Sequence, residues 1–315
     1  MPKVSICIPT YKQVDYLRKT LDSVLLQNFH DYELIVSDDS SNDSVENLLK
    51  EFDFNGKLKY YKNAVALGSP ANWNHSFKKA TGEYIKILHH DDFFTSENSL
   101  AKFVKFLDEN PDSSFAFSGT LIDLVLLKTK NTHHCSDKQF AKMIKQPDCL
   151  FFSNYIGAPS ATIIRNKNTI MFDESLKWLV DVDWYMQLIY QNPKVFFSKE
   201  QLICTVHGGE NQITQSVNRD KEIQVREHVY LFDKLGDKKN NLKKYSLLFQ
   251  LLFHKYDIKD MSQLKSICNV SQKSVAFFVE VFGSMKSAIF LKKMMYWLKK
   301  ISFKDYVFIL KTYFK

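Results

Sequence analysis

The sequence predicts an α/β fold, with a mostly parallel sheet flanked by helices and a helical region after it. Short apolar runs alternate with segments of helical periodicity over the first 120 residues, and from about residue 217 onward nearly every segment has helical spacing. Strand–helix alternation gives right-handed crossovers, so consecutive strands run parallel and helices cover the sheet. We therefore expect an α/β domain over residues 1–215 and a helical region over residues 216–315.

The first half of the chain supplies most of the expected sheet. Apolar runs predict strands at residues 3–9, 33–37, 58–61, 83–88 and 114–118. Helical spacing between these runs predicts helices at residues 16–26, 44–52, 70–80 and 98–107. Further along, a strand is expected at residues 160–165 and a helix at residues 181–191, before Pro193. The intervening residues 122–148 are polar, and we interpret them as an insertion or lid.

Composition excludes several classes of protein. Hydrophobic residues make up 45% of the chain and charged residues 25%, which is ordinary globular usage and excludes a mainly disordered protein. No run reaches the roughly 18 uncharged apolar residues of a membrane span, and the N-terminus is too polar for a signal peptide. The five cysteines are far apart and include no CxxC pair, which favours free thiols in a reducing compartment. A cytoplasmic protein is expected.

Positive charge is concentrated at the C-terminal end. Residues 241–315 hold 14 Lys and 4 acidic residues, whereas the rest of the chain has a small negative balance. On a helical wheel, most lysines of residues 286–315 share one arc, and aromatic and aliphatic side chains occupy most of the remainder. Such a segment fits an anionic membrane surface better than nucleic acid. The alternative is a helical appendage that packs its apolar side on the α/β domain.

Polar side chains follow three of the predicted strands, at the points where the strands end. They are Pro9, Thr10 and Tyr11 after the first strand, Asp38 and Asp39 after the second, and Asp91 and Asp92 after the fourth. Because ligands of open α/β sheets bind beyond the carboxyl ends of the strands, we expect the three clusters to converge on one crevice.

Each cluster has a functional and a structural interpretation. Asp91 and Asp92 are adjacent carboxylates that repel each other, and Mg²⁺ or Mn²⁺ bridging to phosphate would relieve the repulsion; the alternative is a capped helix start. Asp39 could accept the N–H of a nucleotide base or simply belong to a capped turn. Tyr11 could stack on a base or fill the end of the sheet. No GxGxxG or GxxxxGK[ST] motif is present, which disfavours dinucleotide and P-loop sites.

A second group of candidates lies later in the chain. Asp181 and Asp183 begin a predicted helix beside two tryptophans. Acidic residues at a helix start are favoured by the helix dipole, but a carboxylate near aromatic rings could also accept the proton of a sugar hydroxyl. His207 precedes two glycines and could be a third metal ligand or a phosphate contact, although a structural role is more common for a lone histidine.

Taken together, these motifs resemble the family 2 glycosyltransferases, inverting nucleotide-sugar enzymes of the GT-A fold. Residues 4–43 are similar to the family's opening strand, helix and second strand with its Asp-Asp-x-Ser turn, and residues 68–92 are similar to the segment that leads to its metal motif. The resemblance is strong over about residues 3–120, weaker over 150–215, and says little about 216–315. It implies a GT-A-like sheet in the N-terminal domain.

The resemblance implies donor-binding roles for the first two clusters. Pro9, Thr10 and Tyr11 match the loop that packs on the base and ribose of the donor, and Asp39 matches the carboxylate that bonds the base.

It implies metal and ribose contacts for the third cluster. Asp91 and Asp92 match the last two acids of the family's DxD-type motif, which touch the ribose and the diphosphate-bound metal. His89 replaces the usual first acid, so two carboxylates remain for a divalent cation, Mg²⁺ or Mn²⁺. His207 matches a late histidine present in some members, and we take it as a third candidate ligand beside Asp91 and Asp92.

Asp181 matches the catalytic aspartate of the family's Glu-Asp pair, whose first member is here Val180, and Asp183 is the second choice. The loop at residues 157–160 resembles one beside the sugar pocket. The implied mechanism is a single displacement: the base takes a proton from an acceptor hydroxyl while that oxygen attacks the anomeric carbon, which inverts its configuration.

The resemblance implies an inverting glycosyltransferase that moves a sugar from a nucleotide-sugar donor to a lipid-linked or oligosaccharide acceptor, in surface polysaccharide or oligosaccharide biosynthesis. It would work at the cytoplasmic face of the inner membrane as a peripheral protein, with no nucleic-acid partner. One alternative is a nucleotidyltransferase, although residues 9–17 lack the usual glycine-rich loop. Another is a membrane-associated binding or scaffold protein with a degenerate nucleotide site.

Overall fold

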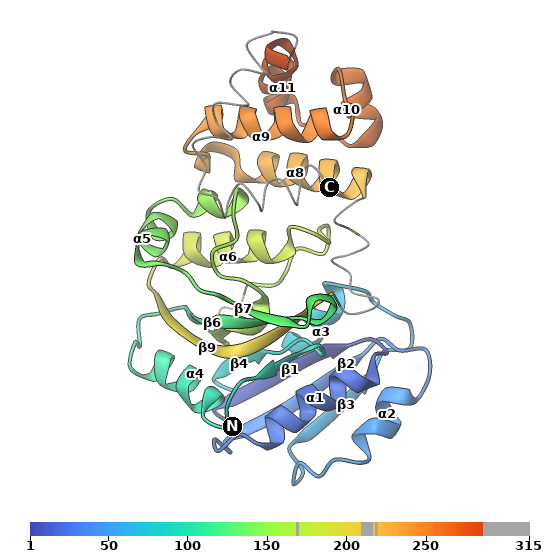
Figure 1. The fold of residues 1–315 in the computed structure, drawn as a ribbon, viewed down its shortest axis with the longest axis vertical. Coiled ribbons are helices and arrows are strands. Elements are labelled where there is room, and N and C mark those ends of the chain that lie inside the picture. The colour runs from blue at the N-terminus through green and yellow to red at the C-terminus, as the bar shows by residue number, and fades with distance from the viewer. Residues whose placement is uncertain (168–169, 209–216, 218–219, 286–315) are drawn as a thin grey trace. The chain divides into compact units, whose positions relative to one another are not determined.

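The computed structural model describes residues 1–167, 170–208, 217 and 220–285 (Figure 1). The chain divides into two compact units, residues 1–210 and residues 211–315, which are described separately below. The sequence placed the domain boundary after residue 215. The basic segment 286–315, predicted to bind a membrane, lies outside the described residues.

Unit 1 is built on one nine-stranded sheet with the order β3-β2-β1-β4-β8-β6-β9-β5, in which β7 pairs with β6. Its strands are β1 (Val4–Thr10), β2 (Tyr32–Asp38), β3 (Leu58–Lys62), β4 (Tyr84–Ile87), β5 (Asp92–Phe94), β6 (Phe115–Leu124), β7 (Thr129–His133), β8 (Thr162–Arg165) and β9 (Val195–His207).

The helices of unit 1 lie on both sides of this sheet (Figure 1). They are α1 (Val14–Leu25), α2 (Ser44–Leu49), α3 (Ala71–Lys79), α4 (Ser99–Asp108), α5 (Asp137–Lys145) and α6 (Val180–Gln191), with the short 3₁₀ turns η1 (Val125–Leu127), η2 (Pro147–Phe151) and η3 (Pro159–Ala161).

Successive side chains of β1 point to opposite faces of the sheet, and each face packs against different helices. On β1, Ile6 and Ile8 belong to the apolar core that also contains residues of α1, α2 and α4. Cys7 points to the other face, where its thiol lies 3.6 Å from the carbonyl oxygen of Ser76 in α3. Because successive side chains point to opposite faces, a strand covered on both sides must be apolar almost throughout. That is why β1 reads as a continuous apolar run.

The predicted α/β architecture is confirmed, with a difference in strand direction. β3, β2, β1 and β4 are parallel as expected. Beyond them, β8 runs antiparallel to β4 and β6, and β5 runs antiparallel to β9. Alternation of strands and helices does not predict these pairings, because no helix separates β4 from β5, and the connection from β7 through α5, η2 and η3 brings β8 in antiparallel to β4 and β6. Residues 122–148, interpreted from the sequence as an insertion or lid, form the last residues of β6, the whole of β7 and the whole of α5, all in unit 1.

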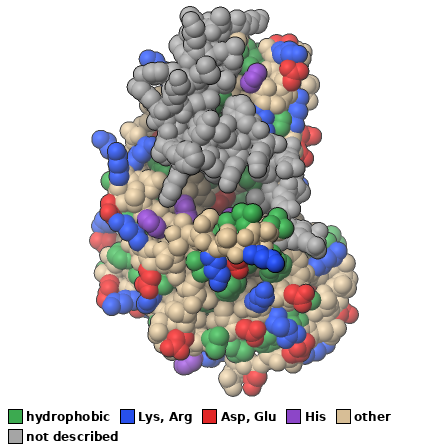
Figure 2. Space-filling model, viewed as in Figure 1, with side chains coloured by type: hydrophobic (Ala, Val, Ile, Leu, Met, Phe, Trp, Pro, Cys, Tyr) green, Lys and Arg blue, Asp and Glu red, His purple; other side chains and the backbone are tan. Residues whose placement is uncertain are grey.

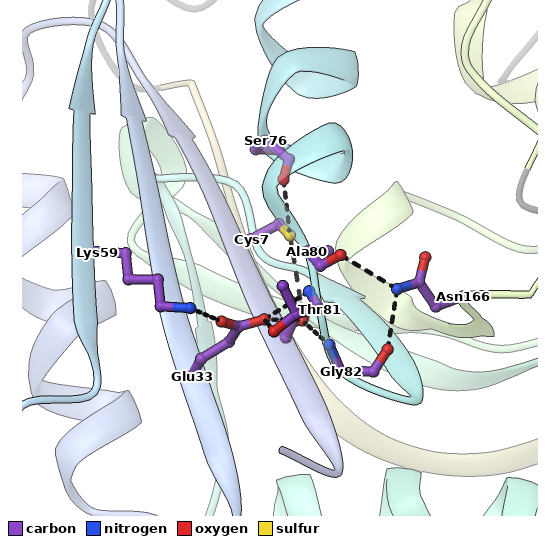
Figure 3. A network of polar contacts seen from close by, with 9 residues as sticks. Cys7, Glu33, Lys59, Ser76, Ala80, Thr81, Gly82 and Asn166 are labelled. Carbon is purple, nitrogen blue, oxygen red and sulfur yellow. Dashed lines mark hydrogen bonds and ion pairs between the residues drawn. The ribbon is translucent and has the colours of Figure 1, made fainter. Parts of the chain in front are cut away.

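A buried carboxylate holds the amino ends of the central strands together (Figure 3). Glu33 on β2 accepts hydrogen bonds from Lys59 at 2.6 Å, Ser5 at 2.5 Å, and the backbone and hydroxyl of Thr81 at 2.7 and 2.8 Å. Burial by itself raises the pKa of Glu33, but these donors outweigh it and lower the pKa to about 2. Gly82 is required beside them, because a Cβ there would lie 2.6 Å from the backbone nitrogen of Ser5.

Unit 2 is helical. Its described elements are α8 (Lys221–Leu235), η4 (Gly236–Lys238), α9 (Leu242–Lys255), α10 (Met261–Ile267) and α11 (Gln272–Met285). Phe232, Phe249, Phe253 and Phe278 form its centre, with neighbouring ring centroids 4.9 to 5.9 Å apart. Aromatic pairs at these spacings add to the stabilisation from buried area. In the described part of the chain, no helix has the length and apolar character needed to cross a membrane.

Candidate active site

The loops after β1 and β2 are tied together where the first two polar clusters lie. The N–H of Asp39 donates to the carbonyl of Thr10 at 3.0 Å, and the N–H of Lys12 donates to the Ser40 hydroxyl at 2.7 Å. Tyr11 is 48% exposed between these contacts. The structure therefore brings Thr10, Tyr11 and Asp39 to neighbouring strand ends, with the ring of Tyr11 available to stack on a ligand.

The carboxylate of Asp39 is held by the loop that follows β3. Oδ1 accepts the side-chain amide of Asn63 at 2.7 Å and the N–H of Leu67 at 3.0 Å, and Oδ2 accepts the N–H of Gly68 at 2.8 Å. A carboxylate offers about four acceptor positions, so one position on Oδ2 remains for a further donor. Asp39 is thus fixed in orientation and can still accept the N–H of a base.

Asn72 organises the same region from α3. Its Nδ2 donates to the carbonyls of Thr10 at 3.3 Å and Ser37 at 3.0 Å, and its Oδ1 accepts the Ser37 hydroxyl at 2.6 Å and the Asn63 amide at 3.1 Å. These bonds use the full hydrogen-bonding capacity of a buried amide. Asn72 therefore joins the carboxyl ends of β1 and β2 to the loop that holds Asp39.

The turn His89–Asp92 lies between β4 and β5 and is fastened by its backbone. The Thr20 hydroxyl of α1 is 2.9 Å from the carbonyl of His90 and 2.8 Å from that of Asp92. The Ser160 hydroxyl accepts the N–H of His89 at 2.9 Å and also bonds the Asp92 carboxylate. Burial, reinforced by the adjacent charge of Asp91, raises the pKa of Asp92 well above its usual value.

Lys86 is a buried cation beneath this turn. Its ammonium group donates to the carbonyls of Ile87 and Ser160, and burial lowers its pKa to about 7, against the opposing effect of the Asp92 charge. The charge of Lys86 in turn favours the ionised form of Asp92. The lysine thus links the carboxylate to the loop that precedes β8.

Asp181 is positioned on the first turn of α6. It is partly exposed, and its Oδ2 accepts the side-chain amide of Asn154 at 3.1 Å. Burial raises the pKa of Asp181 to about 6. Tyr185, one helical turn later on the same face, donates from its hydroxyl to the carbonyl of Gly157 at 3.0 Å. Asp183 is buried, and the amide of Gln187 on the same helix lies 3.4 Å from it.

The charges of the acidic residues act on two other side chains, Tyr185 and His207. Besides burial, the charges of Asp181 and Asp92 both raise the pKa of Tyr185, so the two carboxylates lie near one phenol group. Burial lowers the pKa of His207, and the charge of Asp91 acts in the opposite direction, which places that pair close together as well. Asp181 and Asp92 are therefore within electrostatic range of Tyr185, and Asp91 is within range of His207, while Asp39 lies at the neighbouring ends of β1 and β2.

The same residues include side chains of the kinds that bind metal ions. Within the described residues, no three His, Cys, Asp or Glu side chains are arranged to hold a metal ion by themselves. Asp91 and Asp92 still offer adjacent carboxylates whose mutual repulsion a cation would relieve, and the buried Nε2 atoms of His89 and His90 have no partner among the described residues. This donor set fits a divalent cation that takes its remaining ligands from a diphosphate.

A cavity of about 660 Å³ lies to one side of this group, at the end of β3. It shares Asn63 and Leu67 with the loop that holds Asp39, and its other lining residues are Tyr60, Tyr61, Lys62, Ala64, Val65, His75 and Lys79. The acidic residues do not line it.

Sequence reasoning missed four residues that shape the site: Asn72, Asn154, Ser160 and Tyr185. The loop at residues 157–160 was named, but not the hydrogen bond of Ser160 to His89. Lys86 had a visible signal, because a lysine within an otherwise apolar strand must find partners in the interior. The others carried none, since asparagine, serine and tyrosine are common in helices and loops.

Comparison with known proteins finds glycosyltransferases by sequence and by fold. An uncharacterized glycosyltransferase of Rickettsia typhi is 26% identical over 294 residues, which is 91% of this chain and 82% of that protein. A GalNAc(5)-diNAcBac-PP-undecaprenol beta-1,3-glucosyltransferase of Campylobacter jejuni is 38% identical over 97 residues, 29% of this chain and 30% of that enzyme. The crystal structure of S. aureus TarS 1–349 in complex with UDP-GlcNAc superposes with a TM-score of 0.57 at 19% identity, over 90% of this chain and 80% of that one.

The sequence profile of Glycosyl transferase family 2 matches residues 5–169, which is more than half of the chain. That range contains β1 to β8 and therefore the strand-end loops, the His89–Asp92 turn and Ser160. By sequence as well as by fold, the chain belongs to glycosyl transferase family 2.

Proposed function

We propose that this glycosyltransferase moves a sugar from a nucleotide-sugar donor to a lipid-linked saccharide acceptor, with inversion at the anomeric carbon and with Asp181 as the base. The observation that carries the proposal is the position of Asp181 on the first turn of α6, bonded to Asn154, where burial raises its pKa to about 6. At neutral pH such a carboxylate is mostly ionised and still basic enough to accept a proton in the transition state.

The proposed division of labour follows from the contacts. Tyr11 would stack on the donor base while Asp39, held by Asn63, Leu67 and Gly68, accepts a base N–H through its remaining acceptor position.

Asp181 takes the proton of an acceptor hydroxyl as that oxygen attacks the anomeric carbon from the face opposite the diphosphate. Single displacement needs one base and no covalent intermediate. Asn154 keeps the base oriented through its bond to Oδ2.

A divalent cation, Mg²⁺ or Mn²⁺, would be held by Asp91 and Asp92, with His207 as a third candidate ligand, because its charge is coupled to that of Asp91. When bound, it would offset the negative charge that develops on the departing nucleoside diphosphate. Lys86 supports the ionised form of Asp92 that such a cation requires.

Two similarities support the choice of partners. TarS was crystallised with UDP-GlcNAc, which favours a UDP-linked donor, and the Campylobacter enzyme acts on an undecaprenyl-diphosphate saccharide, which favours a polyprenyl-linked acceptor. An acceptor of this kind would bring the protein to the cytoplasmic face of a membrane as a peripheral protein, and the basic segment 286–315 suits that location.

The test is a screen of UDP-, GDP- and dTDP-sugars against a synthetic polyprenyl-diphosphate saccharide, with and without Mn²⁺. We expect nucleoside diphosphate release coupled to a product whose new linkage is inverted, as read by NMR. Binding of nucleotide sugars with no transfer to any acceptor, or a product with retained configuration, would contradict the proposal.

A further inference from the structure

The turn between β6 and β7 exposes three consecutive aliphatic side chains. Val125, Leu126 and Leu127 are 41%, 78% and 69% exposed. Single exposed apolar residues are normal on protein surfaces, but a contiguous apolar run at the tip of a hairpin marks an interaction surface. We call Val125–Leu127 with the following Lys128 and Lys130 the hairpin tip.

The charge of the hairpin tip has one sign. Lys128 and Lys130 are exposed, and no acidic residue occurs from Leu124 to Ser136, although Asp123 at the base of the hairpin pairs with Lys130 in the strand register. In Figure 2, hydrophobic side chains on the face in view have both basic and acidic side chains near them. Aliphatic side chains flanked by lysines match a membrane interface, where the former enter the acyl boundary and the latter meet anionic headgroups. A protein partner of ordinary polarity would not require this combination.

Strand register places the hairpin tip on the same side as the acidic residues. Asp92 pairs with Thr205 of β9, and Thr205 pairs with Ile122 of β6. Ile122 lies two residues before the end of β6 at Leu124, so the tip begins roughly 7 Å beyond the level of Asp92 along the strand.

The tip is also fixed at its base. Leu124 pairs with His207 at the end of β9. A Cβ on Gly208, whose φ is +87°, would lie 3.1 Å from Cγ of Leu126. The aliphatic side chains are therefore presented by a supported hairpin next to His207.

We propose that the hairpin tip inserts into the interface of an anionic lipid bilayer and thereby holds the acidic site at the height of a lipid-linked saccharide. The choice of a lipid-linked acceptor rests on the proposed function. The contact itself does not involve residues 286–315, which form a separate basic segment of the sequence. Membrane contact through the hairpin tip and membrane contact through residues 286–315 therefore predict different experimental outcomes.

Site-specific fluorescence tests the contact directly. All five native cysteines are buried, so a new surface cysteine can be labelled selectively with the environment-sensitive dye NBD. The full chain would carry Leu126→Cys, with Leu26→Cys as the matched control, because Leu26 is 71% exposed at the end of α1. Vesicles of phosphatidylcholine with and without about one-third phosphatidylglycerol would be added to each.

We expect a blue shift and a several-fold rise in NBD emission at position 126 with phosphatidylglycerol vesicles, and none at position 26. The double variant Leu126→Asp/Leu127→Asp should bind these vesicles at least about tenfold more weakly than Leu26→Asp. No shift at position 126 while the protein sediments with vesicles would overturn the proposal, as would a shift without vesicles that grows with protein concentration and so reports self-association.

The outcome can be separated from that of the proposed function. Calorimetry with UDP on the same samples reports whether the donor site is intact, and Leu126 lies outside that site. Intact nucleotide binding with no insertion of the hairpin tip would overturn only the membrane contact. Insertion without transfer to any acceptor would overturn only the proposed reaction.

Discussion

The side-chain amide of Asn154 donates a hydrogen bond to Oδ2 of Asp181 at 3.1 Å. The same amide donates to the carbonyl of Gly157, and the Asn154 oxygen accepts the N–H groups of Ile156 and Gly157. The proposed base is therefore oriented by a loop that is itself closed by Asn154. This loop lies between η2 and η3, just before Ser160 in the sequence, and Asn154 joins it to the first turn of α6.

Replacing Asp181 with Asn should separate chemistry from binding. Asp181→Asn removes the proton acceptor and keeps the shape, so we expect transfer to fall by roughly 10²–10⁴-fold with nucleotide binding little changed. Asp183→Asn is the matched control, because Asp183 contacts Gln187 on its own helix. Turnover and UDP affinity, measured for both variants, decide the assignment; loss of transfer in Asp183→Asn alone would show that the base is misassigned.

The same substitution should stabilise the fold at neutral pH. The pKa of Asp181 is raised from 3.8 to about 6 in the folded protein, so ionisation disfavours folding; the cost sets in as the pH rises above 3.8 and is complete above about 6. Asp181→Asn should therefore raise the melting temperature at pH 8, by an amount that shrinks as the pH falls toward 4. Thermal unfolding at pH 8 and pH 5 checks this, and an equal shift at both pH values would contradict it.

Transfer should depend on pH through the ionisation of Asp181. Because the base must be ionised, kcat/KM should rise with pH around a midpoint near 6 and level off above 7. The profile is best measured with a saturating concentration of cation. A midpoint near 4, the ordinary value for an aspartate, would mean that burial does not govern this group in the working enzyme.

Asn72 should act on donor affinity more than on turnover. Asn72→Ala removes the bonds that hold Thr10, Ser37 and Asn63 in place, so we expect KM for the donor to rise about tenfold with a smaller change in kcat. Loss of the buried bonds should also cost roughly 1–3 kcal/mol of unfolding free energy. Asn47→Ala, on the surface of α2, is the control; a fall in kcat at unchanged KM would contradict the positioning role.

Removal of the cation should weaken donor binding through Asp91. We expect Mn²⁺ to tighten UDP binding to the native chain and EDTA to reverse this, while Asp91→Asn loses most of the Mn²⁺-dependent gain. The physical reason is that an amide cannot neutralise a cation, although it keeps the size of the side chain. Calorimetry measures the affinity for UDP with and without Mn²⁺ in both proteins. Equal Mn²⁺ dependence in the native and Asp91→Asn proteins would exclude Asp91 as a ligand.

Acid should unfold the protein partly through Glu33. Its pKa is lowered to about 2 in the folded state, so the stabilisation it gives is complete above its unfolded pKa near 4.5 and is lost as the pH falls toward 2. The difference between 4.5 and about 2 corresponds to roughly 3 kcal/mol. In Glu33→Gln, the unfolding free energy should be lower at pH 7 and should vary less between pH 5 and pH 3, as urea titrations can show.

The sequence by itself determined the local elements and the places where they end. Apolar runs such as β1 and β2 must be buried on both faces, so they were legible as strands, and the aspartates that follow them stood out as breaks in that pattern. Asp39, Asp91 and Asp92 could be named for this reason. Local periodicity is a property of neighbouring residues, so it can be recognised in a short segment without considering the rest of the chain.

Tertiary structure alone decided which of these groups share a site. Asn154 meets Asp181 from 27 residues away, Asn72 meets Thr10 from 62 residues away, and Ser160 meets His89 from 71 residues away. Such contacts depend on strand order and register, including the antiparallel placement of β8 beside β4, and no spacing in the sequence encodes them. The pKa of Asp181 likewise follows from burial, which exists only once α6 has packed.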